Sequence, residues 1–510
     1  MNKKKLSVLR RISMLSAVIM LTLTAAFSLT ACGKSNIPEN TVFSADDLAG
    51  KSVGVQLGTT GDIYVSDMES DGSGTKVERF NKGNDAIQAL KQGKIDAVVI
   101  DAQPAKAFVN ANSDLCMLNE DFVTEEYAIC IAKNNSSFTS KVNDALNVLI
   151  NNGTIDNIIS NYIGENASKQ PYEPTGSGEN GTLTIAVNAY FEPYEYYNNG
   201  KVSGIDIDIS NAIADYLGMK LSVEDMEFDS IITAVSSGKA DMGISGITVT
   251  EERKKNIDFT IPYTTSSQVI IVRNNDAANQ GISFSDKFKT DFIKDGRYQY
   301  LLTGLKNTLI IALCAAIMGI VIGFLIAVVR SNHDKTGGMK VLNFICNIYL
   351  TVIRGTPTMV QLLIIYYVIF SSVQVNKIIV AILAFGINSG AYVAEIFRSG
   401  IMSIDNGQFE AARSLGLSYR KTMKLVILPQ AFKNVLPALA NEFIVLLKET
   451  SISGYIGLND LTRGGDIIRS ITYDPMLPLF GVAIIYLVLV VILSSLVKKL
   501  ERRLRSNERH

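Results

Sequence analysis

The chain has 510 residues, of which 47% are hydrophobic, and a formal net charge of -1 at pH 7. This length is too great for one hydrophobic core, so we expect a soluble part joined to a membrane part. The near-neutral charge argues against a nucleic-acid partner. The 5 cysteines are too few for a disulfide scaffold. Cys116 and Cys130 could pair outside the cell, but buried thiols are the favoured state because the sequence gives no distance between them.

The N-terminus has the pattern of an export signal. Lys3, Lys4 and Lys5 begin a basic stretch, an apolar run follows over 12–27, and small residues then precede Cys32. A first transmembrane helix is the alternative interpretation. The pattern before Cys32 resembles a lipoprotein signal, which implies a signal peptide at 1–31 and a lipid on Cys32.

An internal repeat follows in the part without long apolar runs. IQALKQGKIDAVVID (87–101) matches ITAVSSGKADMGISG (232–246): each has an amphipathic helix, a Gly-Lys turn, an Asp and an apolar strand. The repeat predicts two related α/β lobes, at 36–166 and 182–275. A segment rich in Pro, Gly and Ser, 167–181, is the predicted linker between them.

Strands and helices alternate in both lobes, which favours parallel sheets. Ligands of such sheets lie beyond the carboxyl ends of the strands, so Asp101 and Gly246 are expected at a common cleft. The predicted strands are 52–56, 77–80 and 97–100 in the first lobe and 183–187, 221–223 and 242–244 in the second, with helices at 205–216 and near 142–162.

The membrane part is expected at 301–500, after a linker at 276–300 and before a basic tail at 501–510. Basic residues follow the first, third and fifth apolar stretches, so that side is expected to be cytoplasmic and the lobes extracytoplasmic. The predicted spans number about five, because the apolar stretches are 307–329, 341–370, 378–397, 431–447 and 478–497.

A polar segment between the third and fourth spans, EAARSLGLSYRKTMKLVILP (410–429), predicts two short helices parallel to the membrane. Gly416 permits a bend, and Pro429 is expected to end the second helix. An ordinary solvated loop is the alternative. The segment resembles the EAA loop of ABC importer permeases, which implies that it docks on an ATPase subunit. The residues to which this role carries over are Glu410, Ala411, Ala412, Gly416, Leu428 and Pro429.

The two lobes also carry motifs of a known family. AVNAYFEPYEY (186–196), SGITVTEERKKNIDFTIPY (245–263), GKSVGVQLGTTGD (50–62) and DAVVID (96–101) resemble the amino-acid solute-binding proteins of ABC importers. In that family the lobe with the first two motifs precedes the other, so the order here predicts a circular permutation. The strand 268–273, which in the family crosses between the lobes, here leads toward the membrane.

The resemblance implies a site for a zwitterion. Arg253, in the first turn of a helix that Thr248 or Thr250 can cap with Glu251 in a capping box, is expected to bind the α-carboxylate. Thr59 and Thr60 would hold the same group from the other lobe, and Asp101 would bind the α-ammonium. Phe191 and Phe228 match the aromatic walls, and Gln56 and Asn188 match contacts to the side-chain end. The alternatives are a surface arginine, a strand-end cap and two core phenylalanines.

As a whole the chain resembles a polar amino-acid ABC importer of the histidine, glutamine and glutamate type, with a binding lipoprotein fused to its permease. That family implies a transport protein, not an enzyme, that works with an amino-acid substrate, a second permease copy as a homodimer and a separate pair of ATPase subunits. We expect no cofactor or metal. Asn188, in place of an acidic residue, favours a neutral polar or acidic substrate over a cationic one. The alternative functions are a ligand-gated channel, for which a TVGYG filter is missing, and a chemoreceptor.

Overall fold

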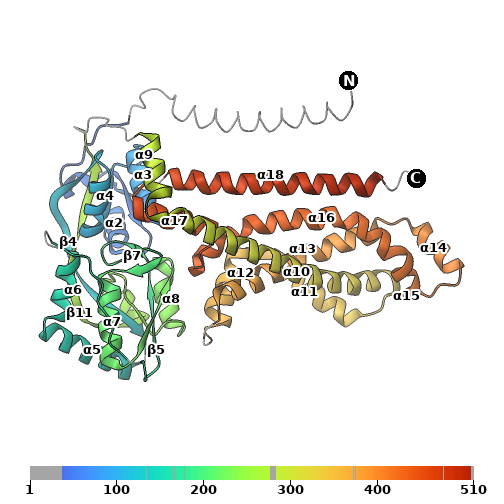
Figure 1. Cartoon of the computed structure of the whole chain (residues 1–510), viewed down its shortest axis with the longest axis horizontal. Helices are drawn as coiled ribbons and strands as arrows, with labels where there is room; N and C mark the ends of the chain where they lie inside the picture. The colour runs from blue at the N-terminus through green and yellow to red at the C-terminus, as the bar shows by residue number, and fades with distance from the viewer. Residues whose placement is uncertain are drawn as a thin grey trace.

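The computed structural model describes residues 37–506 apart from 134, 165–166, 177, 276–282, 372, 374 and 475. A two-lobed α/β domain occupies one end, and long helices extend away from it toward the other end (Figure 1). This arrangement confirms the predicted fold class. The expected signal peptide and Cys32 lie outside the described residues.

We call the lobe that comes first in the chain lobe A and the one that follows it lobe B. Lobe A is built on a parallel sheet. Strand β1 (Ser52–Gln56) lies between β2 (Lys76–Phe80) and β3 (Ala97–Asp101). The sheet is covered by α2 (Thr60–Ser70), α3 (Gly83–Lys91) and α4 (Ala102–Ala111). All of β3 is buried, as expected for a strand with helices on both faces.

Lobe B is built on β5 (Thr182–Val187), which pairs in parallel with β9 (Lys220–Asp225) and β10 (Met242–Gly243). Its core includes α7 (Ile205–Leu217) and two helices that come before it in the chain, α5 (Ser136–Asn151) and α6 (Thr154–Tyr162). The apolar faces of α5 and α6 therefore place residues 136–162 in lobe B and not in the predicted first lobe. The expected single helix at 142–162 is also divided, because Gly153 between the two has a left-handed backbone with φ of 77°.

Two long strands join the lobes. Strand β4 (Leu115–Ala132) and strand β11 (Ile257–Arg273) form an antiparallel pair over most of their length. Strand β11 also pairs with β3 of lobe A, and β4 with β10 of lobe B, which gives one sheet with the order β2-β1-β3-β11-β4-β10-β5-β9. The crossing strands are thus present despite the reversed lobe order, and β11 ends in lobe A. Cys116 and Cys130 lie near opposite ends of β4, too far apart for a disulfide.

Within the part of the chain that the structure describes, three helices are long and apolar enough to cross a membrane: α10 (Tyr298–Thr336), α13 (Lys377–Met402) and α18 (Leu477–Ser506). A fourth span is possible as a broken pair, in which α11 (Lys340–Gly355) meets α12 (Thr358–Ile364) and its extension η6 (Ile365–Ile369) at a bend of 107°. The predicted span 341–370 is therefore not one straight helix, because Pro357 has no N–H and restricts the residue before it. The fourth predicted range, 431–447, lies within α16 (Leu428–Glu449), which is helical but is not among these apolar spans.

The polar segment contains α14 (Asn406–Ser414), α15 (Tyr419–Thr422) and the π-helical turn η7 (Met423–Ile427), with Gly416 at φ of 83° between the first two. The expectation that Pro429 ends the second helix is wrong. Pro429 lies in the first turn of α16, where its missing N–H has no partner to lose, so the helix runs on. The remaining elements are η1 (Ala45–Leu48), β6 (Tyr190–Phe191), β7 (Glu195–Asn198), β8 (Lys201–Ser203), η2 (Phe228–Ser230), α8 (Ile231–Ser236), η3 (Arg253–Lys255), α9 (Phe284–Phe288), η4 (Lys289–Ile293), η5 (Lys294–Gly296), η8 (Thr450–Ile456) and α17 (Leu461–Thr472).

Candidate ligand-binding site

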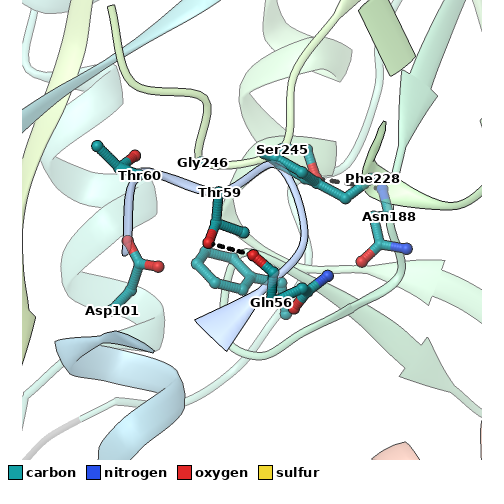
Figure 2. Close-up of a pocket in the computed structure, with 9 residues that line it drawn as sticks. Gln56, Thr59, Thr60, Asp101, Asn188, Phe228, Ser245 and Gly246 are labelled. Carbon is teal, nitrogen blue, oxygen red and sulfur yellow. Dashed lines mark hydrogen bonds between the residues drawn. The ribbon is translucent and has the colours of Figure 1, made fainter. Parts of the chain in front are cut away.

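A pocket lies between the two lobes, at the carboxyl ends of their parallel strands. The closed lobes leave a small cavity of about 20 Å³ there. Figure 2 shows side chains from both lobes around it. Eight of the ten predicted site residues line this pocket, and Ser245 joins them. The lining is Gln56, Thr59, Thr60 and Asp101 from lobe A and Asn188, Phe191, Phe228, Ser245 and Gly246 from lobe B.

Lobe A presents a tight turn between β1 and α2. Thr59 is the N-cap residue of α2, and its hydroxyl donates to the Gln56 carbonyl at 2.7 Å. Gly58 makes this turn possible with φ of 76°, which other residues rarely adopt. The start of α2 therefore faces the cleft, with the backbone N–H groups that a helix terminus leaves available to an anion.

Thr248 and Arg253, the two predicted residues outside the pocket lining, hold the lobes together beside it. The Thr60 hydroxyl of lobe A donates to the Thr248 hydroxyl at 2.9 Å. The Arg253 guanidinium donates to the carbonyl of Thr248 and, across the cleft, to the carbonyl of Gly58, both at 2.8 Å. The hydrogen bonds between the lobes stabilise the closed form of the cleft.

The helix expected around Arg253 is shorter than predicted. It is the three-residue η3, and the Arg253 N–H donates to the Thr250 hydroxyl at 3.2 Å. Glu251 forms an exposed ion pair with Lys254 at 2.7 Å, so it does not complete the predicted capping box. A single turn this short offers no helix terminus that could bind a carboxylate. The Arg253 guanidinium is therefore the group at η3 that could do so.

An acidic cluster lies at the Asp101 end of the pocket. Asp101 is buried and accepts a hydrogen bond from the Tyr127 hydroxyl, and burial raises the pKa of its carboxyl. Glu125, on the crossing strand β4, accepts from the Thr248 hydroxyl at 2.6 Å. Burial, followed by the charge of Asp101, raises the pKa of Glu125 to about 7. Among the described residues, Glu125 Oε1 and the neighbouring Gln268 Oε1 have no hydrogen-bond donor, so this end suits a ligand cation.

Asn188 is held so that its carbonyl oxygen serves the pocket. Its Nδ2 donates to the Met226 carbonyl at 2.8 Å, and its backbone N–H donates to the Ser245 hydroxyl at 3.1 Å. The first bond fixes which end of the amide is the nitrogen. Figure 2 shows the oxygen of Asn188 on the side of Gln56 and the nitrogen turned away. The side chain therefore presents an acceptor, which selects a ligand group that donates.

A buried pair of carboxyl groups supports the wall formed by Ser245 and Gly246. Ser245 donates to Glu195, and the Gly246 N–H donates to Asp206 at 2.9 Å. Burial raises the pKa of Asp206 to about 6 and that of Glu195 well above its usual range. Phe191 packs closely on this turn, since a Cβ on Gly246 would lie 2.7 Å from its ring.

The sequence interpretation missed Glu125, Glu195, Asp206, Ser245 and Gln268. Two of them had a readable signal. Asp206 stands between two isoleucines at the start of α7, and Gln268 directly precedes the apolar run 269–272. The others required knowledge of which strands lie side by side.

The predicted ATPase-docking residues lie at the end of the helical part farthest from the two lobes (Figure 1). Glu410, Ala411, Gly416 and Pro429 are exposed, Leu428 is half-buried and Ala412 is buried. Leu415, between the two short helices, is 83% exposed, which is unusual for a large apolar side chain.

Comparisons with known proteins identify both parts. The family described as bacterial extracellular solute-binding proteins, family 3, matches residues 183–451. This match begins in the first strand of lobe B and runs on into the helical part.

The helical part matches permeases. The chain is 41% identical over 211 residues to the arginine transport system permease protein ArtQ of Bacillus subtilis (strain 168), covering 41% of this chain and 94% of that protein. It is 37% identical over 208 residues to the glutamine transport system permease protein GlnP of Escherichia coli (strain K12), covering 40% and 93%. A solved structure titled as an amino acid ABC transporter with histidines matches at 40% identity with a TM-score of 0.40, covering 44% of this chain and all of that one. The chain therefore belongs to the amino-acid ABC importers and joins a family 3 solute-binding domain to a permease in one polypeptide.

Proposed function

We propose that this chain captures one amino acid in the cleft between its lobes and passes it through its own helical part. A separate pair of ATPase subunits, docked at the segment 410–429, would supply the energy, and two copies of the chain would form the pore. In this proposal, residues 36–275 perform capture and 301–500 perform passage. The lobes would face the extracytoplasmic side, since basic residues flank the opposite ends of the helices.

One observation carries the proposal: a pocket between the closed lobes has chemically opposite ends, and it belongs to the same chain as a permease. The acidic cluster at Asp101 suits an α-ammonium. The start of α2 and the nearby Arg253 suit an α-carboxylate.

We also propose a substrate class. Asn188 offers an acceptor without a charge, and Gln56 is a neutral amide beside it. An acidic side chain has no hydrogen to donate to Asn188 at neutral pH, and a cationic one would meet no carboxylate there. A neutral amide side chain, as in glutamine, satisfies the acceptor. The relatives named for glutamine and for arginine make these two amino acids the decisive comparison.

The test is a calorimetric titration of the purified full-length chain with each of the twenty amino acids. Glutamine is expected to bind most tightly, and arginine far more weakly. Tightest binding of arginine would overturn the substrate class while leaving capture intact. Failure to bind any amino acid would contradict the proposed function itself.

Uptake is tested separately, in proteoliposomes that contain the chain and its ATPase subunits. ATP-dependent accumulation of the bound amino acid is expected. Substitution G416P, at a position with φ of 83° that proline cannot adopt, is expected to abolish uptake and leave binding unchanged. Loss of binding in this variant would contradict the assigned separation of capture from ATPase docking.

A further inference from the structure

The short helix α17 (Leu461–Thr472) lies where the two lobes meet the membrane helices (Figure 1). Its apolar side is fixed by a core that includes Leu461, Ile468 and Val482. Asp460 caps its first turn by accepting from the N–H groups of Thr462 and Arg463 at 2.7 and 3.0 Å. This helix is therefore a rigid part of the permease surface.

One end of α17 is inserted into lobe B. Arg463 is fully buried and forms ion pairs with Asp225 and, at 3.5 Å, with Glu227, both just beyond β9 or at its end. It also donates to the Gly454 carbonyl at 2.7 Å. Withdrawing a buried guanidinium from its partners would leave uncompensated buried charge, so this contact is costly to break.

Lobe B has a second, apolar attachment to the permease. Met226, Ile231 and Val235 share one buried core with Tyr366 and Phe385 of the membrane helices. At its edge Lys239 donates to the carbonyls of Phe370 and Val373 at 3.1 and 2.9 Å, and Lys377 pairs with Glu224 at 2.6 Å. Lobe B is thus attached as firmly as two parts of one domain.

The attachment of lobe A to the permease is of a different kind. Lys82 pairs with Asp466 at 2.5 Å, and Asp85 pairs with Arg469, both on the next turns of α17. The side chain of Asp85 is 40% exposed. The rings of Phe108 and Tyr473 meet edge to face at 5.1 Å, and Asn81 donates to the Tyr455 hydroxyl at 3.4 Å. These contacts are mainly ion pairs and hydrogen bonds, whereas lobe B shares a buried apolar core with the membrane helices.

The ligand pocket adjoins this junction directly. In the two-residue strand β6, Phe191 lines the pocket while Tyr190 faces α17. The Tyr190 ring has Lys82 of lobe A at 4.9 Å and Arg463 of the permease at 5.4 Å from its centre. Lys82 also lies 3.8 Å from Glu227 of lobe B. One lysine of lobe A therefore reaches lobe B and α17 together, which it can do only while the lobes are closed.

We propose that lobe B stays docked on the permease and that lobe A alone moves. In this proposal lobe A binds α17, through ion pairs of Lys82 and Asp85, only when the cleft is closed. This inference rests on the proposed function. Contacts that exist only in the closed state stabilise that state, and closure and ligand binding favour each other by linkage. The permease helix α17 therefore raises the ligand affinity of the cleft above it, although it contributes nothing to the pocket lining.

The first test measures amino-acid affinity of the full-length chain with substitutions in α17. D466N and R469Q each remove one partner of lobe A and are expected to raise the Kd about 5- to 20-fold. K377Q is the matched control, because it breaks an ion pair of similar exposure between lobe B and the permease, and its Kd is expected to stay within about 2-fold. Charge exchange, with K82E and D466K combined, is expected to recover affinity relative to K82E alone.

A second test follows the movement itself. The pair D85C and R469C is expected to be joined by a short bifunctional thiol reagent faster when glutamine is present than when it is absent. The pair E224C and K377C, between lobe B and α13, is expected to be joined at the same rate in both conditions. The wild-type chain controls for the native cysteines.

The outcomes separate the two proposals. If the wild type binds an amino acid and D466N and R469Q bind it equally well, the inference about α17 is wrong and the proposed function stands. Ligand-dependent joining of the E224C and K377C pair would likewise show that lobe B moves. A wild-type chain that binds no amino acid would overturn the proposed function and this inference with it.

Discussion

The two lobes share a fold but contribute different chemistry to the cleft. Lobe A presents hydroxyls, a helix start and the carboxylate of Asp101, beside Glu125 of a crossing strand. Lobe B presents two phenylalanine rings and the amide of Asn188. Every amino acid has an ammonium and a carboxylate, and amino acids differ in their side chains. The proposed function therefore assigns most of the common part of the ligand to lobe A, assisted by Arg253 of lobe B. It assigns the choice among side chains mainly to lobe B, assisted by Gln56 of lobe A.

The largest effect on affinity is expected when the α-ammonium of the ligand loses its counter-charge, the carboxylate of Asp101. D101N keeps the shape of the side chain and removes its negative charge, so the α-ammonium of any ligand would be buried without a counter-charge. We expect the Kd for every amino acid to rise on the order of 100-fold, measured by titration calorimetry. An unchanged melting temperature would show that the fold is intact. Loss of affinity for only some amino acids would break the assignment of Asp101 to the common part.

A smaller effect, on selectivity, is expected in lobe B. N188D replaces a neutral acceptor by a charged one and removes the donor to the Met226 carbonyl. The ratio of arginine affinity to glutamine affinity is expected to rise by about 10-fold or more, since a carboxylate favours a cationic side chain. The same competition assay on D101N provides the control, because that variant should weaken both ligands alike. Equal weakening of both ligands by N188D would remove Asn188 from the selectivity role.

The smallest effect concerns pH. Glu125 has a pKa of about 7, above its ordinary value of 4.5, so the empty cleft holds a proton there at and below neutral pH. A bound ammonium favours the carboxylate and lowers this pKa, so binding expels the proton. Affinity is therefore full above pH 7 and falls as the pH drops below it, by at most about 10-fold per pH unit. Titrations at pH 6, 7 and 8 measure this slope.

The pH effect is assigned to Glu125 by substitution. The groups that face this carboxyl are Asp101, Tyr64, Arg253, the hydroxyls of Thr60 and Thr248, and the amide of Gln268. E125Q is expected to bind with an affinity that no longer changes between pH 6 and 8. If the affinity of E125Q still falls with decreasing pH, the proton is assigned to Asp101. The pH effect on affinity would then lie wholly in lobe A.

The strands and most of the pocket were predictable from the sequence, whereas the contacts between distant segments were not. Strand β1 was predicted with its observed bounds, 52–56, because a short apolar run lies between turn residues. Asp101 and Gly246 were predictable because the ends of parallel strands converge, whereas the expectation for Thr59 came from the resemblance to the solute-binding family. The chain gives no local sign that Arg463 inserts into lobe B or that α5 packs there, since each pairing depends on the complete fold.

The errors at 341–370 and at Pro429 have the same physical origin. A proline weakens a helix in its interior, but its effect depends on its position in the turn, which the sequence does not specify. Pro357 follows the end of α11 and marks a bend, while Pro429 lies at the start of α16 and is tolerated there.

Because β11 continues in the same polypeptide as α10, the capture domain is never free to diffuse away from its permease. Tethering of this kind holds a domain at an effective concentration in the millimolar range. Ion pairs such as Lys82 with Asp466, too weak to hold two separate proteins together at cellular concentrations, are then sufficient for repeated engagement. The rate at which a loaded domain delivers its cargo would consequently be independent of how much of the protein the cell makes.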